Sequence, residues 1–302
     1  MGSFAYAAPE NLEEAFAVLG NHISAGQRIQ ILAGGTDVLV QLKSMDGEPR
    51  TFLDIKKIAE TRQLSLDGDH IYIGSTIICA ELYENEALKQ LFPGLVESVD
   101  LIGSTQIQGK ATLGGNLCNA SPAGDTIAAL YANRAVCVIA SKSGARELPV
   151  EEFVTGVGQN ALGSDELLLG LKLPKPLGSA SDAYLRFIPR TEMDIAVAGA
   201  GVSLTLDAQG MCTQATVAIS AVAVTPLLVP EAASALVGSM LDEDSLKRAA
   251  DASSALARPI SDKRGTAEFR RKVVGVLTKR AAVIACTRAR ASAGGIENGE
   301  VN

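Results

Sequence analysis

The sequence contains no tryptophan, few other aromatic residues and only two histidines. Aromatic residues make up 4% of the 302 positions, so stacking platforms for nucleobases are not expected. Neither His22 nor His70 lies in a loop with a plausible nucleophile, and we expect both histidines at the surface. The formal net charge of −7 argues against a nucleic-acid binder, which would carry a basic excess. We therefore predict no catalytic residues in this chain, and any redox chemistry requires a bound cofactor.

The five cysteines stand far apart, and none of them forms a C-x-x-C pair. Their spacing encodes neither a zinc site nor an iron–sulfur cluster, so no metal site is expected. Charged residues such as Glu10, Glu13 and Glu14 interrupt any apolar segment of a signal peptide near the N-terminus. An odd number of cysteines without a signal peptide indicates reduced thiols in the cytoplasm.

Long apolar runs are also lacking. The longest uncharged run, residues 208–230, contains Gln, Thr, Gly and Pro and is rich in β-branched residues, which favours strands over a membrane span. Hydrophobic residues at 47% and charged residues at 20% are typical of a globular chain with a sizeable core.

Two Gly-Gly pairs, each followed by polar residues, are the most informative features present. The first lies in residues 31–38, ILAGGTDV, after an expected strand and before a helix expected over residues 36–43; the second opens residues 112–125, TLGGNLCNASPAGD. Glycine pairs let the backbone enter left-handed conformations, and consecutive N–H groups in such turns form a concavity for phosphate. Either pair alone is also consistent with ordinary turn chemistry, but together they favour a site for a dinucleotide.

Two other nucleotide motifs are absent. Residues 103–111 have five residues between the glycines of a P-loop-like pattern, and Ala111 replaces the Ser or Thr that binds magnesium. Gly199 and Gly201 lack the third glycine and the following helix of a Rossmann fingerprint.

The sequences AGGTD and TLGGNLCNASPAGD resemble the FAD-binding medium subunit of the molybdenum-containing hydroxylases. The resemblance extends to residues 184–196, YLRFIPRTEMDIA, and to residues 261–271, SDKRGTAEFRR, so it covers nearly the whole chain. This family includes carbon monoxide dehydrogenase, 4-hydroxybenzoyl-CoA reductase and the flavin part of xanthine dehydrogenase. The dispersed cysteines, without a cysteine-bearing insertion, disfavour the reductase branch with its additional iron–sulfur cluster.

The resemblance implies the positions that bind FAD. Residues surrounding the pyrophosphate would be Ile31, Leu32, Ala33, Gly34, Gly35, Thr36, Asp37, Val38, Thr112, Leu113, Gly114, Gly115 and Asn116. Ser121 and Asp125 would add polar contacts, with Asp125 near the ribityl and phosphate groups. Ile102 and Leu168 would be apolar contacts, although core packing is an open alternative for both. Arg186 stands where some relatives carry a lysine near the flavin.

The resemblance also implies the role of the chain. A large subunit holding molybdopterin would oxidise the substrate, and a small subunit would pass electrons through two [2Fe-2S] clusters to FAD on this chain. FAD would then deliver them to NAD⁺, O₂ or another acceptor, in a cytoplasmic assembly expected to be a dimer of heterotrimers. The alternative is a stand-alone FAD-dependent oxidoreductase with its own substrate, which requires a general base near the flavin; no histidine or tyrosine in the loops obviously supplies one.

The expected fold is α+β. A two-subdomain FAD-binding domain of the PCMH type, residues 1–175, would precede a C-terminal domain of antiparallel sheet and helices, residues 180–290, with linker composition at residues 174–181. Strands are expected over residues 184–188, 195–206 and 216–224, and helices over residues 231–237, 245–256 and 266–291.

Residues 262–290 carry nine Lys or Arg and two Asp or Glu, a local charge of +7, so the rest of the chain carries −14. Such a segment is typical of a solvated amphipathic face. The alternative is a docking surface for an acidic partner subunit.

Overall fold

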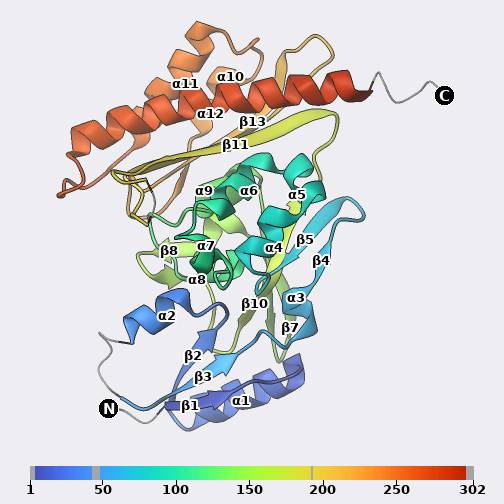
Figure 1. The fold of residues 1–302 in the computed structure, drawn as a ribbon, viewed down its shortest axis with the longest axis vertical. Coiled ribbons are helices and arrows are strands. Elements are labelled where there is room, and N and C mark those ends of the chain that lie inside the picture. Colours follow the sequence, from blue (N-terminus) through green and yellow to red (C-terminus); the bar gives the residue numbers. More distant parts are fainter. Residues whose placement is uncertain (1–3, 43–47, 192, 297–302) are drawn as a thin grey trace.

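A computed structural model describes residues 4–42, 48–191 and 193–296. Three units follow one another along the long axis of the molecule, each built on its own sheet (Figure 1). We call them the N-terminal unit (residues 4–55), the central unit (residues 56–174) and the C-terminal unit (residues 179–296). The α+β class expected from the sequence is confirmed.

The N-terminal unit is a small parallel sheet with two helices. Its elements are β1 (Phe4–Ala7), α1 (Leu12–Ser24), β2 (Arg28–Leu32), α2 (Thr36–Gln41) and β3 (Arg50–Asp54), with the strand order β1-β3-β2. Helix α1 begins at Asn11, whose side chain accepts the N–H of Glu14 at 2.9 Å and satisfies one free donor of the first turn. Ala15 and Leu19 are buried on its inner face and join a core cluster that includes Leu167 and Leu169 of the central unit.

The central unit is a five-stranded antiparallel sheet with short helices packed around it. Its elements are α3 (Ala59–Arg62), β4 (Leu64–Ser65), β5 (His70–Gly74), α4 (Cys79–Glu84), α5 (Glu86–Leu91), α6 (Pro93–Asp100), α7 (Thr105–Gln108), α8 (Leu113–Cys118), α9 (Ile127–Ala132), β6 (Val136–Ser141), β7 (Gly144–Pro149), a 3₁₀ turn (Val150–Glu152), β8 (Val154–Gly156), β9 (Gln159–Asn160) and β10 (Leu167–Pro174). The strand order is β4-β5-β10-β6-β7, with β8 and β9 forming a separate pair. Strand β10 lies in the middle of this sheet, where it pairs with β5 on one side and with β6 on the other.

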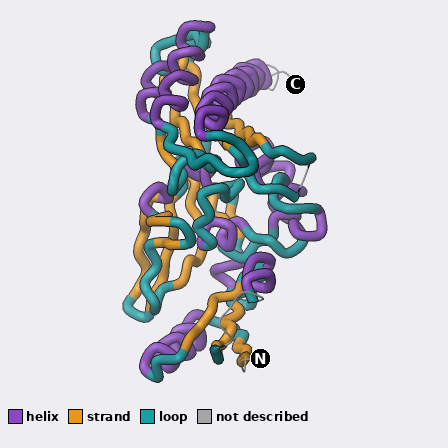
Figure 2. The backbone as a smooth tube through the Cα atoms, turned by 90° about the vertical axis from the view of Figure 1, so that its left-hand side faces the viewer, coloured by secondary structure: helices purple, strands orange, loops and turns teal. Residues whose placement is uncertain are grey.

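The C-terminal unit is an antiparallel sheet covered by helices on both faces. Its elements are β11 (Ser179–Phe187), β12 (Ala198–Leu206), β13 (Cys212–Ser220), β14 (Leu227–Leu228), α10 (Pro230–Leu236), α11 (Glu243–Leu256) and α12 (Ala267–Ile296). The 30-residue helix α12 lies across β11 and β12 on the outer face, while α6 and α9 of the central unit cover the inner face (Figures 1 and 2). Small residues on α12, among them Ala281, Ala285 and Ala289, are buried and let the helix approach the sheet closely. Within the described ranges, no helix is both long enough and apolar enough to cross a bilayer.

Several local expectations need correction. Residues 113–118 form helix α8 instead of a turn, and α2 ends at Gln41, while residue 43 of the expected helix lies outside the described residues. His22 lies within the last turn of α1, half-buried, with its ring nitrogens 2.8 Å from Val18 O and Thr51 Oγ1. His70 is exposed, as expected, but it begins strand β5. Propensity alone missed these contacts because they depend on the neighbouring strand β3.

One buried carboxylate joins the central and C-terminal units. Asp182 on β11 is 2% exposed and accepts the N–H groups of Gly94 at 2.8 Å and Leu95 at 2.9 Å, at the start of α6. It also accepts Nδ2 of Asn133, at the end of α9, at 2.7 Å. Burial raises the pKa of Asp182 to about 6, and these hydrogen bonds oppose that rise. The close approach of α6 also needs Gly94, because a Cβ there would lie 2.5 Å from Cα of Ala183.

We predict that Asp182→Ala lowers the free energy of unfolding by about 3 kcal/mol or more, because three buried donors lose their acceptor and each costs about 1–3 kcal/mol. Asp182→Asn retains one acceptor oxygen and should lose less. Asp100→Ala, which removes an exposed carboxylate at the end of α6, should change the free energy of unfolding by less than about 0.5 kcal/mol. Urea unfolding measures all three variants. Equal stability of the two alanine variants would contradict the assigned role of Asp182.

Candidate cofactor site

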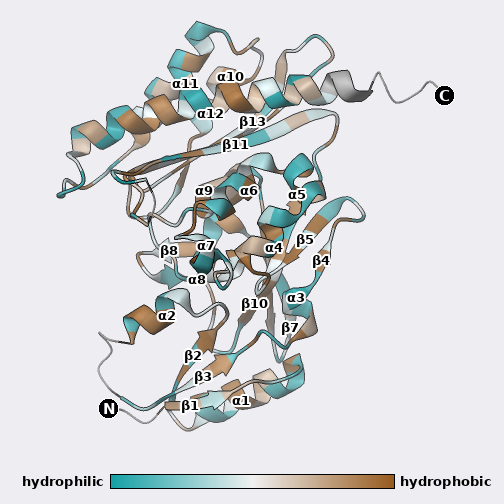
Figure 3. Ribbon diagram, in the orientation of Figure 1, coloured by the Kyte–Doolittle hydropathy of each residue, from teal (hydrophilic) through white to brown (hydrophobic). Residues whose placement is uncertain are grey.

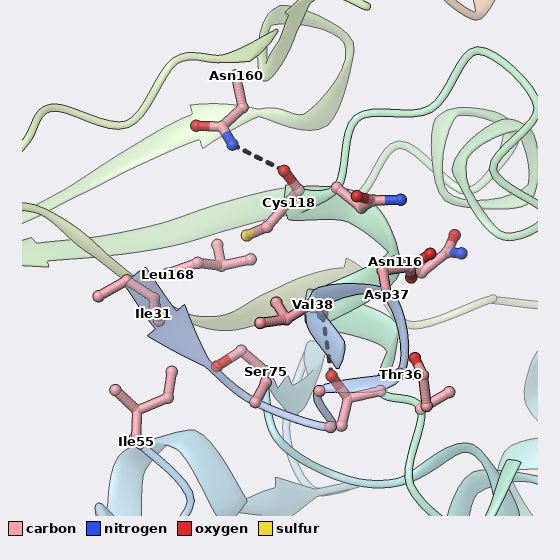
Figure 4. A pocket seen from close by; sticks show the side chains of 18 of the residues that line it. Ile31, Thr36, Asp37, Val38, Ile55, Ser75, Asn116, Cys118, Asn160 and Leu168 are labelled. Atoms are coloured by element: carbon pink, nitrogen blue, oxygen red, sulfur yellow. Dashed lines mark hydrogen bonds between the residues drawn. The ribbon is translucent and has the colours of Figure 1, made fainter. Parts of the chain in front are cut away.

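A cavity of about 440 Å³ lies between the N-terminal and central units. Both Gly-Gly segments line it, and its side chains come from β2, α2, α8 and β10 (Figure 4). The lining residues are Gln30, Ile31, Ala33, Gly34, Gly35, Thr36, Asp37, Val38, Gln41, Ile55, Ser75, Ile102, Ala111, Thr112, Gly114, Gly115, Asn116, Cys118, Asn119, Gly158, Asn160, Leu162, Glu166, Leu167 and Leu168. The volume falls within the range of ligand-binding pockets.

The first glycine segment is held tightly between the two units. Gly35 has φ of +77°, a left-handed conformation that favours glycine, and it turns the chain from β2 into α2. A Cβ on Gly34 would collide with the carbonyl oxygen of Lys110, so glycine is needed for packing at this position. Lys56 Nζ donates to the carbonyl of Ala33 at 2.9 Å and to the carboxylate of Asp54 at 2.8 Å, which fixes the loop from the other side.

The start of α2 presents free donors to the cavity. In the described part of the chain, the N–H groups of Thr36, Asp37 and Val38 have no acceptor, as is normal for the first turn of a helix. All three residues line the cavity. These donors are suited to the oxygens of a phosphate.

The second glycine segment differs from its expectation. Gly114 and Gly115 lie inside α8 and do not adopt positive φ, so the predicted left-handed turn is wrong here. Position 114 needs glycine for packing, because a Cβ there would lie 2.5 Å from Cβ of Ser75. Gly115 faces the other segment, since a Cβ there would lie 3.9 Å from Cβ of Ala33. Its N–H donates to Thr112 Oγ1 at 2.9 Å, which caps the helix.

The cavity contains most residues expected at the site, with Ile102 and Leu168 among them. Five expected residues do not line it: Leu32, Leu113, Ser121, Asp125 and Arg186. Leu113 is fully buried in the central core.

Asp125 and Arg186 form a buried ion pair between the central and C-terminal units, with 2.7 Å between Oδ1 and Nη1. Burial raises the pKa of Asp125 to about 6, and the adjacent guanidinium limits the rise. The ion pair lies near α8. Asn116, in α8, accepts a hydrogen bond of 2.8 Å from the hydroxyl of Thr126, the residue that follows Asp125. The buried hydroxyls of Tyr184 and Ser220 have no hydrogen-bond partner among the described residues.

A third wall of the cavity was missed by the sequence interpretation. It runs from Gly158 to the start of β10 and includes Asn160 and Glu166. Asn160 Nδ2 donates to the carbonyl of Cys118 at 2.9 Å. Cys118 is half-buried and lines the cavity, where burial raises the pKa of its thiol to about 12. No motif marks residues 158–166, which reach the cavity through long-range contacts such as that of Asn160 with Cys118, and only Leu168 at the start of β10 was expected here.

Comparison with known families decides the family of the chain. The family model described as "FAD binding domain in molybdopterin dehydrogenase" matches residues 2–176, and the model described as "CO dehydrogenase flavoprotein C-terminal domain" matches residues 183–285. The chain belongs to the FAD-binding medium subunits of the molybdenum hydroxylases. It is an oxidoreductase subunit, and its cofactor is FAD.

Individual members of this medium-subunit family align along nearly the whole chain. The carbon monoxide dehydrogenase medium chain of Afipia carboxidovorans is 32% identical, over 96% of this chain and 99% of the relative. The nicotinate dehydrogenase FAD-subunit of Eubacterium barkeri is 28% identical, over 82% of this chain and 84% of the relative. A solved structure of carbon monoxide dehydrogenase from Hydrogenophaga pseudoflava has a TM-score of 0.89 and 29% identity, covering 95% of this chain and 98% of that chain.

The cavity of this medium subunit fits part of a dinucleotide cofactor. The free N–H groups of α2 lie on one side of the cavity, and Gly115 of α8 lies on the other. A side chain at Gly115 would enter the space between the two glycine segments. Gln41 Nε2 donates to Asn119 Oδ1 at 3.3 Å and bridges the two helices. Among the described residues, no cluster of His, Cys, Asp and Glu has the arrangement of a metal site.

The third wall predicts a pH dependence of stability. Arg146 donates two hydrogen bonds of 2.7 Å to Glu166, which also accepts the N–H of Gly163 at 2.7 Å. Arg146 is the main cause, and together these donors lower the pKa of Glu166 from 4.5 to about 2. Because the folded pKa is the lower one, the stabilisation is complete above about pH 4.5 and is lost as the pH falls towards 2.

Without FAD, the free energy of unfolding should fall as the pH is lowered from about 6 to about 3. We expect this fall to be smaller for Glu166→Gln than for the wild type. Urea titrations at several pH values measure the difference. The exposed control variant Glu13→Gln should follow the wild-type curve. Parallel curves for Glu166→Gln and the wild type would show that the ion pair does not stabilise this wall.

Proposed function

We propose that this chain is the electron-output subunit of a molybdenum hydroxylase. Electrons from substrate oxidation on a large molybdopterin subunit pass through [2Fe-2S] clusters of a small subunit to the FAD of this chain. An external acceptor, NAD⁺, O₂ or another molecule, then receives them. The complex is a cytoplasmic dimer of heterotrimers in this proposal.

The observation that carries the proposal is the cavity formed by two glycine segments in a chain of the FAD-binding medium-subunit family. The relatives bear names such as "medium chain" and "FAD-subunit", which describe one chain among several. Bound FAD supplies a carrier that accepts and releases electrons, while the protein binds and orients it.

We infer that the pyrophosphate lies between α2 and α8. The N–H groups of Thr36, Asp37 and Val38 would donate to phosphate oxygens from one side. The backbone of Gly115 would approach from the other side, with Asn116 at the end of the segment. Ile102 and Leu168 would provide apolar contacts, since both border the cavity.

The residues outside the cavity receive supporting roles in the proposal. Leu32 and Leu113 would position the two glycine segments by packing. Asp125 and Arg186 would set the polarity at the end of the site nearest the C-terminal unit, and Ser121 lies in the loop that leads to them. We further propose that the chain divides into domains of residues 1–175 and 180–290, joined by the segment between β10 and β11.

The isolated chain should bind FAD but oxidise no hydroxylase substrate. FAD-loaded protein would be mixed under anaerobic conditions with purines, N-heterocycles and aldehydes while the flavin absorbance is recorded. We expect no bleaching by the chain alone, and bleaching by the accepted substrate once the partner subunits are present. Bleaching without partners would favour a stand-alone oxidoreductase and contradict the proposal.

Gly115→Val should abolish FAD retention while the protein still unfolds cooperatively. The added side chain enters the space between Gly115 and Ala33, and it crowds Thr112 Oγ1, which would lie 2.8 Å from the new Cβ. Cys118→Ala is the matched control, since it also alters the cavity wall but only removes a sulfur. The flavin-to-protein ratio and melting with and without added FAD measure both variants. The placement of the pyrophosphate is wrong if Gly115→Val keeps its FAD or Cys118→Ala loses it.

A further inference from the structure

The outward face of α12 exposes apolar side chains at regular intervals. Phe269 is 41% exposed, and Val276 and Val283 are each 43% exposed. Their spacing of seven residues places them on one side of the helix, away from the buried alanines that pack on the sheet. The inner ring edge of Phe269 packs against Phe187, with 5.8 Å between the ring centroids. Figure 3 shows α12 crossing the upper part of the molecule, with hydrophobic and hydrophilic colours alternating along it.

Three cations flank these side chains. Lys272, Arg280 and Arg290 are exposed, and helical geometry places them on the same face of α12 as Val276 and Val283. We call these six residues the outer strip: Phe269, Lys272, Val276, Arg280, Val283 and Arg290. It extends about 30 Å at a rise of about 1.5 Å per residue.

Other cations of the basic segment already have partners. Arg270 is 5% exposed and pairs with Asp262 at 2.7 Å, while Arg264 pairs with Asp194 at 3.1 Å. Lys279 pairs with Glu243, and Arg288 pairs with Glu97. These pairs stabilise the C-terminal unit and are not available for docking.

The outer strip, by contrast, has no carboxylate partner among the described residues. Arg290 makes one bond, to the carbonyl of Met240 at 3.2 Å, and no salt bridge forms at Lys272 or Arg280. A row of apolar side chains with unpaired positive charges on both sides is complementary to an apolar row flanked by carboxylates.

We propose that the outer strip docks a partner subunit through a surface with an apolar row flanked by Asp or Glu side chains. This inference rests on the proposed function, which supplies such subunits. The three apolar side chains would provide the contact area, and the cations would fix orientation and accelerate association. The apolar row has no Trp or Leu, and the opposite face of α12 is held on the sheet, so the strip is poorly suited to a bilayer surface.

The test uses the co-expressed complex with FAD bound. The first variant is Lys272→Glu/Arg280→Glu/Arg290→Glu, and the second is Val276→Ser/Val283→Ser. The matched control, Lys57→Glu/Arg62→Glu/Lys142→Glu, makes the same charge change at exposed positions of the central unit. FAD content and cooperative melting verify that each variant folds.

We expect the triple strip variant to raise the dissociation constant for the partner subunits at least tenfold, and the matched control to change it less than twofold. Added salt should weaken the wild-type complex and strengthen the complex of the triple strip variant, in which it screens the repulsion between the new glutamates and the partner's carboxylates. The serine variant should dissociate faster at every salt concentration. Dissociation constants follow from dilution series analysed by native mass spectrometry.

An intact complex in the triple strip variant would overturn the outer strip while leaving the electron-output function in place. Failure of the wild-type chain to bind any other subunit would overturn the proposed function and this inference together. If the strip variants instead change only self-association of the chain, or its sedimentation with phosphatidylserine vesicles, the occupant is a second copy or a membrane and the inference is wrong.

Discussion

The cofactor cavity depends on two contacts between backbones that come too close for a Cβ. Gly34 lies against the carbonyl of Lys110, and Gly114 lies against Ser75. The first contact fixes the distance between the N-terminal and central units, and the second fixes α8 within the central unit, so the space between α2 and α8 has a defined width. Glycine at these positions acts through protein packing, whereas Gly35 provides a left-handed turn and Gly115 leaves room inside the cavity. One sequence feature, Gly-Gly, thus serves three structural purposes at four positions.

The C-terminal unit is attached to this arrangement by polar groups. Asp182 receives donors from α6 and α9, and Arg288 on α12 donates to the carbonyl of Asp182 at 3.1 Å and to Glu97. The Asp125–Arg186 pair makes a further connection near the end of α8. The helices α6 and α9 are therefore shared between the central core and the C-terminal sheet. We expect a surface on the C-terminal unit to keep a constant orientation relative to the cofactor cavity.

Local sequence predicted the elements whose signals are local. The strand expected over residues 195–206 and the helix expected over residues 245–256 follow from local apolar patterns, and they correspond to β12 and α11. Helix α8 could not be predicted, since glycine is a poor helix former. The presence of Gly114 in this helix is explained only by its contact with Ser75, which is distant in the sequence. Likewise, the basic sequence of residues 262–290 predicts one charged face, yet Arg270 is buried and pairs with Asp262, eight residues earlier. Expected FAD contacts from the two glycine segments gather at one cavity, but its third wall depends on long-range pairing of β10.

The central position of β10 has a consequence for synthesis on the ribosome. Strand β10 pairs with both β5 and β6 and carries Leu168 on the cavity wall, so the central sheet cannot close until residue 174 has left the exit tunnel. Helices α6 and α9 acquire their carboxylate acceptor still later, when Asp182 emerges. Until then, the glycine segments belong to a chain with an open apolar core. The cavity wall is therefore complete only after more than half of the polypeptide has been made.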